Sequence, residues 1–132
     1  MAEQTIADLQ RRLQRLEDKE AIVTLLNRYC KFADTHQWSA YTSCYFEDGV
    51  VQFDDWDDVV GRDKIAALIS SAEDRFQGRQ HSLANINLSI DGDQATGTCN
   101  LWFAATLDTS EPHEYHGFGG PYQFTFKCLA VE

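Results

Sequence analysis

Long apolar segments are absent from this sequence. No run approaches the roughly 20 apolar residues that a membrane-spanning helix requires. Residues 1–16 mix charged and apolar positions and contain no apolar block preceded by basic residues, so we expect no secretion signal and a cytoplasmic location. No repeat, linker or low-complexity stretch divides the 132 residues, a length that suits one hydrophobic core. The sequence therefore predicts a single domain over residues 1–132.

Cysteine patterns typical of metal sites and disulfide scaffolds are absent as well. The four cysteines are widely spaced and form no CxxC pair, which argues against a zinc site and against structural disulfides. We expect all four to be reduced core residues: Cys30, Cys44, Cys99 and Cys128.

Basic residues are scarce. The chain has 11 Lys and Arg residues against 21 Asp and Glu residues, which gives a net charge of -10 at pH 7. Such a charge repels the phosphate backbone of nucleic acids and the anionic face of membranes, so neither is expected as a partner.

Apolar residues at helical spacing occupy the N-terminal part of the chain. A stripe with steps of three and four residues predicts a first helix: Ile6, Leu9, Leu13 and Leu16. A second helix is predicted from about residues 18–20 to His36, with a wider apolar arc that indicates deeper burial. A third, short helix is predicted from Trp38 to Phe46, and a fourth begins at residues 61–63.

The apolar period changes to two after the third predicted helix. Two short strands are predicted around Val51 and Val59, on either side of an acidic hairpin at residues 54–58. Three long strands follow the fourth helix: His81–Ile90, Gln94–Leu107, and a last one from Tyr115 or Tyr122 to Val131. Helices first and antiparallel strands last is the order of an α+β fold, not of repeated βαβ units.

A set of short motifs occurs in a fixed order: Leu13-x-x-Leu16-Glu17-Asp18-x-Glu20-Ala21-Ile22, Leu26-x-x-Tyr29, Ala33-Asp34, Trp38, Phe46-x-Asp48-Gly49 and His81-x-Leu83-x-Asn85. Their order and spacing, over about residues 9–126, resemble the SnoaL-like family of the nuclear transport factor 2-like superfamily. That superfamily includes polyketide cyclases, scytalone dehydratase, a hexachlorocyclohexane dehydrochlorinase and ketosteroid isomerase.

The resemblance implies a cystatin-like α+β cone, in which a curved antiparallel sheet wraps around N-terminal helices and encloses a mostly apolar pocket. Family members usually add one more strand, often opening Gly-Trp-Arg, after the strand that would end here near Val131. This sequence stops at Glu132. The final family strand is therefore expected to be missing, and a shortened chain, a replaced strand or a strand from a partner subunit are the alternatives.

Asp34 and His81 are the first candidates for chemistry. Asp34 closes the second predicted helix near the negative end of its dipole, a position that favours proton uptake. Positions 84, 86, 88 and 90 are apolar, so His81 shares the opposite strand face with Leu83, Asn85 and Asn87 and enters the pocket if that face looks inward.

The resemblance implies that Asp34 and His81 pair as they do in the dehydratase and dehydrochlorinase members. There the Asp orients the imidazole, and the free ring nitrogen removes a proton, which suits a group whose pKa is near neutrality. The alternative is an exposed Asp34 at a helix end and a hydrogen-bonded His81 at a strand end, with no role in catalysis.

Asp54 is a second candidate. It lies eight residues after Phe46, where the resemblance to ketosteroid isomerase implies a carboxylate base, and Tyr29 falls near the hydrogen-bond-donating tyrosine of that enzyme. However, Asp54 belongs to an Asp-Asp-Trp-Asp-Asp cluster, and such clusters are usually solvated. The cluster also lacks the Gly and Glu spacing of a calcium loop.

No metal, nucleotide or other cofactor is expected. His113 and His116 flank Glu114 at a helical spacing in a stretch that is predicted to be loop or strand, so a surface location is favoured. Gly119-Gly120-Pro121 has no helix after it to present amide groups to a phosphate, and it is interpreted as a bend or bulge in the last strand.

A further set of residues, mostly apolar or aromatic with two polar members, is expected from alternation to line the pocket: Tyr29, Tyr41, Tyr45, Phe46, Phe53, Asp54, Trp56, Leu83, Asn85, Leu101 and Phe103. Such a lining suits a ring-bearing or lipid-like ligand. Trp102 has the opposite parity and is predicted to lie on the outer sheet face, through which family members commonly form homodimers.

Together these features lead to a functional hypothesis: a cofactor-independent lyase or isomerase, of dehydratase type, acting on a hydrophobic cyclic small molecule. His81 would remove the proton, Asp34 would hold the imidazole, and Tyr29, Tyr45 or Asn85 would polarise a substrate oxygen. Three alternatives remain: a non-catalytic ligand-binding or scaffolding domain of the same fold, a polyketide-cyclase-like enzyme, and a ketosteroid-isomerase-like enzyme that uses Asp54.

Overall fold

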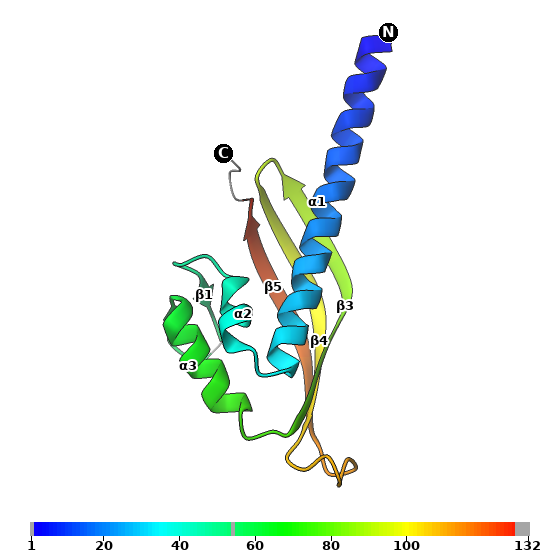
Figure 1. Cartoon of the computed structure of the whole chain (residues 1–132). Helices are drawn as coiled ribbons and strands as arrows, with labels where there is room; N and C mark the ends of the chain where they lie inside the picture. Colours follow the sequence, from blue (N-terminus) through cyan, green and yellow to red (C-terminus); the bar gives the residue numbers. More distant parts are fainter. Residues whose placement is uncertain (1, 54, 129–132) are drawn as a thin grey trace. The chain divides into compact units, whose positions relative to one another are not determined.

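The computed structural model describes residues 2–53 and 55–128. The elements in this part of the chain are α1 (Ala2–Asp34), α2 (Trp38–Ser43), β1 (Val50–Val51), β2 (Val59–Val60), α3 (Arg62–Glu73), β3 (Gly78–Asp91), β4 (Gln94–Thr106) and β5 (His116–Lys127) (Figure 1). The predicted α+β order is confirmed. The predicted end of the last strand, Val131, lies outside the described residues.

Two sheets are formed. β1 and β2 pair antiparallel, with Val50 opposite Val60, and the larger sheet has the order β3-β4-β5. β3 and β4 are joined by the predicted turn, in which Gly92 adopts a φ of 59° that favours glycine. Among residues 2–53 and 55–128, no helix combines the length and apolar character needed to cross a membrane.

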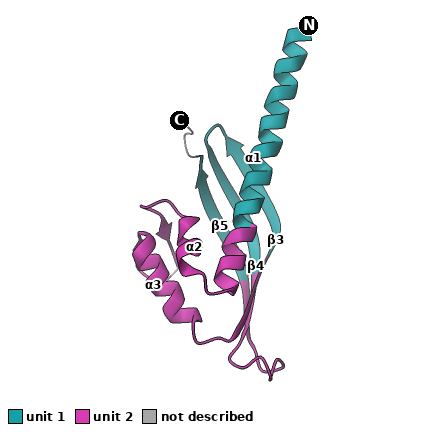
Figure 2. Ribbon diagram, viewed as in Figure 1, with its two compact units in different colours: residues 1–26, 83–101, 120–132 teal, residues 27–82, 102–119 magenta. Residues whose placement is uncertain are grey.

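The chain divides into two compact units (Figure 2). Unit 1 comprises residues 1–26, 83–101 and 120–132, and unit 2 comprises residues 27–82 and 102–119. The boundary passes through α1, β3, β4 and β5, whereas α2, α3, β1 and β2 belong wholly to unit 2.

The N-terminal segment is one helix of 33 residues, not the two helices that the sequence predicts. The expected break near residues 17–19 does not occur because Leu16 to Ala21 contains no glycine or proline and consists mainly of good helix formers. The end of the predicted second helix is confirmed. His36 adopts a left-handed φ of 57°, and the amides of His36 and Gln37 donate to the carbonyls of Ala33 and Phe32, as in a Schellman motif.

Unit 1 has its core along one face of β4. Every second residue is buried at Ala95, Gly97, Cys99 and Leu101. A Cβ at Gly97 would lie 2.8 Å from the Leu88 side chain, so a larger residue here would force that side chain to move.

The cysteine prediction holds in part. Cys30 and Cys99 are buried and Cys44 is half-buried. The prediction of a core position is wrong for Cys128, which is exposed. The reason is its place just after β5, where its amide donates to the carbonyl of Asp93 at the hairpin turn.

The predicted face of β3 is interrupted at Asn85. His81 and Leu83 are half-buried, but from Ile86 onward the even positions are half-buried and the odd ones, including Asn87, are exposed. Asn85 has a φ of 55°, a left-handed conformation that asparagine tolerates and that breaks the two-residue alternation. The expectation that His81, Leu83, Asn85 and Asn87 share one strand face is therefore wrong.

Unit 2 has a separate core between its helices. Ile65 of α3 is fully buried and packs with Ala33 of α1 and Tyr41 of α2, with half-buried Phe32 and Ile69 against them. Ala33 directly precedes Asp34, so this core fixes the last turn of α1.

Candidate active site

Asp34 and His81 are in direct contact within unit 2, as predicted. Nδ1 of His81 lies 2.6 Å from Oδ1 of Asp34, and the backbone amide of His81 donates to both carboxylate oxygens at 3.0 and 3.1 Å. The side chains are 9% and 22% exposed for His81 and Asp34. The end of α1 and the first part of β3 are therefore joined by three contacts between Asp34 and His81, which fix the orientation of the imidazole.

Glu73 is a third member that the sequence analysis missed. Its Oε1 lies 3.2 Å from Nε2 of His81, and its side chain is 13% exposed. Its Oε2 is buried without a hydrogen-bond partner among the described residues. The expectation that the second ring nitrogen of His81 is free is therefore wrong, because both nitrogens face carboxylates. A signal existed in the sequence: Glu73 follows Ile65 and Ile69 at four-residue steps, so it shares their inward helix face.

The two carboxylates control the charge of His81. Burial alone lowers its pKa, but the hydrogen bonds and charges of Asp34 and Glu73 outweigh burial and raise the pKa to about 9. At neutral pH His81 is thus an imidazolium whose two N–H groups donate to Asp34 and Glu73.

Aromatic rings cover the imidazole. The ring centroids of Phe103 and His81 are 4.7 Å apart. Phe103 is itself buried, and its ring centroid lies 6.3 Å from that of Phe76 and 5.2 Å from that of Phe118. Apolar surroundings strengthen the interaction between the imidazolium and its carboxylates because they exclude water. Phe103 was predicted in the pocket lining, and it contacts His81 of the dyad.

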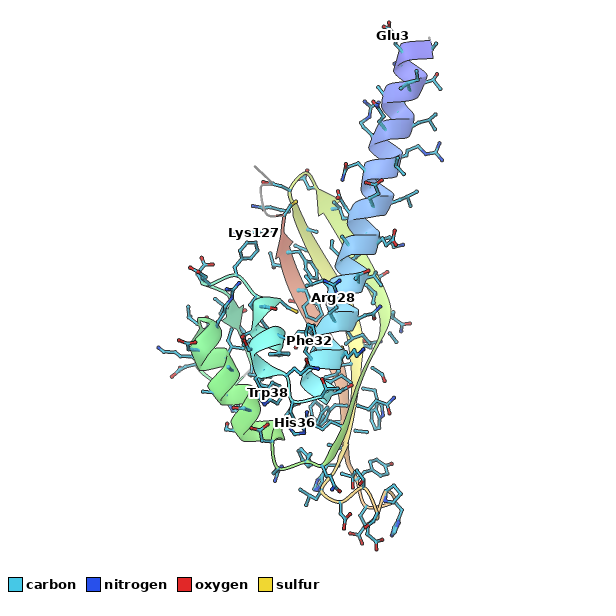
Figure 3. All side chains as sticks on the ribbon, viewed as in Figure 1. Glu3, Arg28, Phe32, His36, Trp38 and Lys127 are labelled. Carbon is cyan, nitrogen blue, oxygen red and sulfur yellow. The ribbon has the colours of Figure 1, made fainter. Side chains whose placement is uncertain are left out.

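Arg79 holds the ends of the two helices that carry the carboxylates. Its guanidinium donates to the carbonyl of Ala33 at the end of α1. It also donates to the carbonyls of Glu73, the last residue of α3, and of Phe76 after it, at 3.1 and 3.4 Å. It also contacts His36, which lies beside Trp38 after the last turn of α1 (Figure 3).

Replacing Arg79 by methionine is expected to lower the free energy of unfolding by about 1–3 kcal/mol, because the carbonyls at two helix ends lose a charged donor. Urea denaturation followed by circular dichroism measures the change. Arg28→Met is the matched control, since Arg28 is exposed. Equal stability of the two variants would contradict the capping role of Arg79.

Three predicted pocket residues form a tyrosine cluster in unit 2. The Tyr41 hydroxyl donates to that of Tyr29 at 3.1 Å and lies 3.1 Å from that of Tyr45. The Tyr29 and Tyr41 rings are 4.8 Å apart between centroids. Burial raises the pKa of Tyr45 above its usual value of 10.0 despite the neighbouring hydroxyls, so Tyr45 stays protonated at neutral pH.

The other predicted pocket residues are scattered. Phe46 is half-buried, while Phe53 and Trp56 are 40% and 59% exposed and contact each other at the surface, 5.2 Å between centroids. Asp54 lies outside the described residues. Leu83, Asn85 and Leu101 belong to unit 1, where Leu101 is buried, Leu83 half-buried and Asn85 exposed.

A surface hollow of about 450 Å³ lies on the outer face of the sheet in unit 2, on the side of Trp102 and Tyr115. Trp102 is 49% exposed, which confirms its predicted outward orientation.

His113 and His116 are both exposed, as expected. Within residues 2–53 and 55–128, no three His, Cys, Asp or Glu side chains are grouped as metal ligands.

Helices followed by an antiparallel sheet define an α+β domain. The SnoaL-like domain model matches residues 14–128, and the chain belongs to this family. The fold class and the resemblance predicted from the sequence are thereby confirmed.

Solved structures agree with this assignment. A nuclear transport factor 2-like protein with a cystatin-like fold from Novosphingobium aromaticivorans is 27% identical, with a TM-score of 0.77 over 90% of this chain and 77% of that chain. A provisionally assigned scytalone dehydratase from the same organism is 18% identical, with a TM-score of 0.77 over 87% and 76%. A provisionally assigned dehydratase from Streptomyces avermitilis is 17% identical, with a TM-score of 0.71 over 84% and 86%. Comparison with curated protein sequences finds no match.

Proposed function

We propose that the chain is a cofactor-independent lyase or isomerase of dehydratase type that acts on a hydrophobic cyclic small molecule. His81 transfers the proton and Asp34 orients the imidazole. The observation that carries this proposal is the position of His81, which is 91% buried at its side chain and bonded through both ring nitrogens to carboxylates of α1 and α3. Perturbed titratable groups of this kind concentrate at functional sites.

The chemistry needs a substrate with a hydroxyl group β to a carbonyl. The neutral imidazole removes a proton from the carbon next to the carbonyl through Nε2, the carbon–carbon double bond forms, and the hydroxyl group leaves. The imidazolium then gives that same proton to the leaving oxygen, which becomes water, so the enzyme ends as it began. Asp34 stabilises the transient imidazolium through Nδ1.

Glu73 has two roles in this proposal. In the resting enzyme Glu73 accepts the hydrogen bond from Nε2–H of His81. When Nε2 acts as the base, the substrate lies next to Nε2 in place of the Glu73 carboxylate. Its second oxygen is a buried acceptor without a partner among the described residues, and a substrate hydroxyl can donate to it. Leaving a buried carboxylate oxygen unpaired costs free energy, which a bound donor would recover.

The pH dependence of kcat/KM is expected to report His81. The base must be neutral, and a pKa of about 9 leaves only about 1% of it neutral at pH 7. Activity should therefore rise with pH and level off above about pH 9. Glu73→Gln removes one of the two charges that raise the pKa, so its pH profile should shift to lower pH. Glu114→Gln, at an exposed position, is the matched control.

The measurement is turnover of ring-bearing β-hydroxy carbonyl compounds between pH 5 and pH 10 for the wild type and both variants. A profile that falls through pH 9 would show that His81 acts as an acid. A profile unmoved by Glu73→Gln would remove Glu73 from the site.

We also propose that two copies associate through the outer sheet face of unit 2. Trp102 and Tyr115 are 49% and 60% exposed there, beside the surface hollow. Exposed aromatic residues around a hollow are typical of protein interfaces. Trp102→Arg should reduce the mass measured by light scattering if this face holds the copies together.

A further inference from the structure

The N-terminal part of α1 carries an uncovered apolar stripe in unit 1. Its four members are between 54% and 64% exposed: Ile6, Leu9, Leu13 and Leu16. Their spacing of three, four and three residues is that of the a and d positions of a coiled coil. The next position in the repeat is Glu20, so the uncovered stripe spans two heptads, and Val23 beyond it is half-buried.

We infer that this stripe pairs in parallel with the same stripe of a second copy of the chain. The first argument is the charge of the segment. Residues 2–20 contain four basic and five acidic residues, a net charge of -1, while the whole chain carries -10. Electrostatic repulsion between two copies is therefore concentrated in the rest of the chain and is weak along residues 2–20.

The second argument is charge complementarity beside the stripe. With Ile6 at an a position, Arg12 is at g and Glu17 is at e of the next heptad. A parallel pair places each Arg12 next to Glu17 of the other copy, twice by symmetry. An antiparallel pair would instead bring the g positions together, and Arg12 and Lys19 are both basic. The charges therefore select the parallel arrangement.

Two polar contacts within the helix lie away from the stripe. The ion pair of Arg11 with Asp8 and the hydrogen bond from Gln14 to Asp18 use side chains at b, c and f positions, away from the stripe. Residues 2–20 are already helical as part of α1, so pairing does not carry the free-energy cost of helix nucleation.

The test is the mass of the full chain over a range of concentrations by sedimentation velocity. The wild type should associate, and Leu9→Glu with Leu13→Glu should raise the dissociation constant at least 100-fold because charges enter the a and d layers. Circular dichroism should show unchanged helix content, since both positions are exposed. If the outer sheet face also joins copies, the same comparison is made in the Trp102→Arg background, in which only the stripe can pair.

Charge exchange tests the orientation. Arg12→Glu should weaken association several-fold, and adding Glu17→Arg should restore it, whereas Arg15→Glu at a c position should have little effect. A wild type that stays monomeric, or a mass unchanged by the stripe variant, would overturn the inference. A double exchange that fails to restore association would overturn the parallel arrangement.

Discussion

Replacing His81 by glutamine is expected to lower kcat by about 10²- to 10⁴-fold, the usual contribution of a general base. Glutamine can keep a hydrogen bond to Asp34 but cannot accept a proton from carbon. Asp34→Asn should also lower kcat, because the amide oxygen can still accept one hydrogen bond from the His81 backbone but carries no charge to stabilise the imidazolium. Single-turnover assays with ring-bearing β-hydroxy carbonyl compounds measure the effect.

The controls separate chemistry from folding. His113→Gln changes a histidine whose side chain is 72% exposed and should leave kcat unchanged. Thermal unfolding should show that the His81 and Asp34 variants remain folded. If the folded His81 variant turned over at the wild-type rate, proton transfer would not pass through His81, and the family fold would serve binding in this chain instead.

Replacing Ile65 by alanine is expected to destabilise unit 2 by about 2–5 kcal/mol, the range observed when a fully buried isoleucine is truncated. Ile65 is 0% exposed and packs against Ala33 and Tyr41, so the cavity would open in the core that fixes the last turn of α1. Urea denaturation should show a lower midpoint, and the pairing of Asp34 with His81 should loosen as a consequence.

Val60→Ala is the matched control for this loss. Val60 is a β-branched residue of the same unit, but it is 49% exposed, and its truncation should cost less than about 1 kcal/mol. If both variants lost the same stability, the cluster around Ile65 would not be the core of unit 2.

Much of the fold follows from local pattern. The predicted start of α3 at residues 61–63 is confirmed, and Gly61, which precedes the helix, has a φ of 96° that favours glycine. The turn at Gly92 follows from its Asp-Gly sequence. A break in α1 was wrongly expected because a change in burial along one helix produces the same apolar pattern as a change from one helix to the next. Periodicity alone cannot separate the two cases.

The candidate site was predictable only in part. Asp34 and His81 are 47 residues apart, and the resemblance to a family, not spacing, brought them together. Glu73 was missed because a carboxylate near a helix end is usually solvated, although its helical register with Ile65 placed it inward. The reversal of burial at Asn85 could not be foreseen, because one left-handed residue moves every later side chain of the strand to the other face.

The most direct test of the central claim is the NMR titration of the His81 imidazole in the full chain, with the His81→Gln variant to assign its signals. We expect an apparent pKa of about 9 for His81 and a lower pKa in both Asp34→Asn and Glu73→Gln, because each carboxylate stabilises the imidazolium. A pKa at or below the ordinary value of 6.5, unchanged in both variants, would contradict a buried imidazolium held between the two carboxylates.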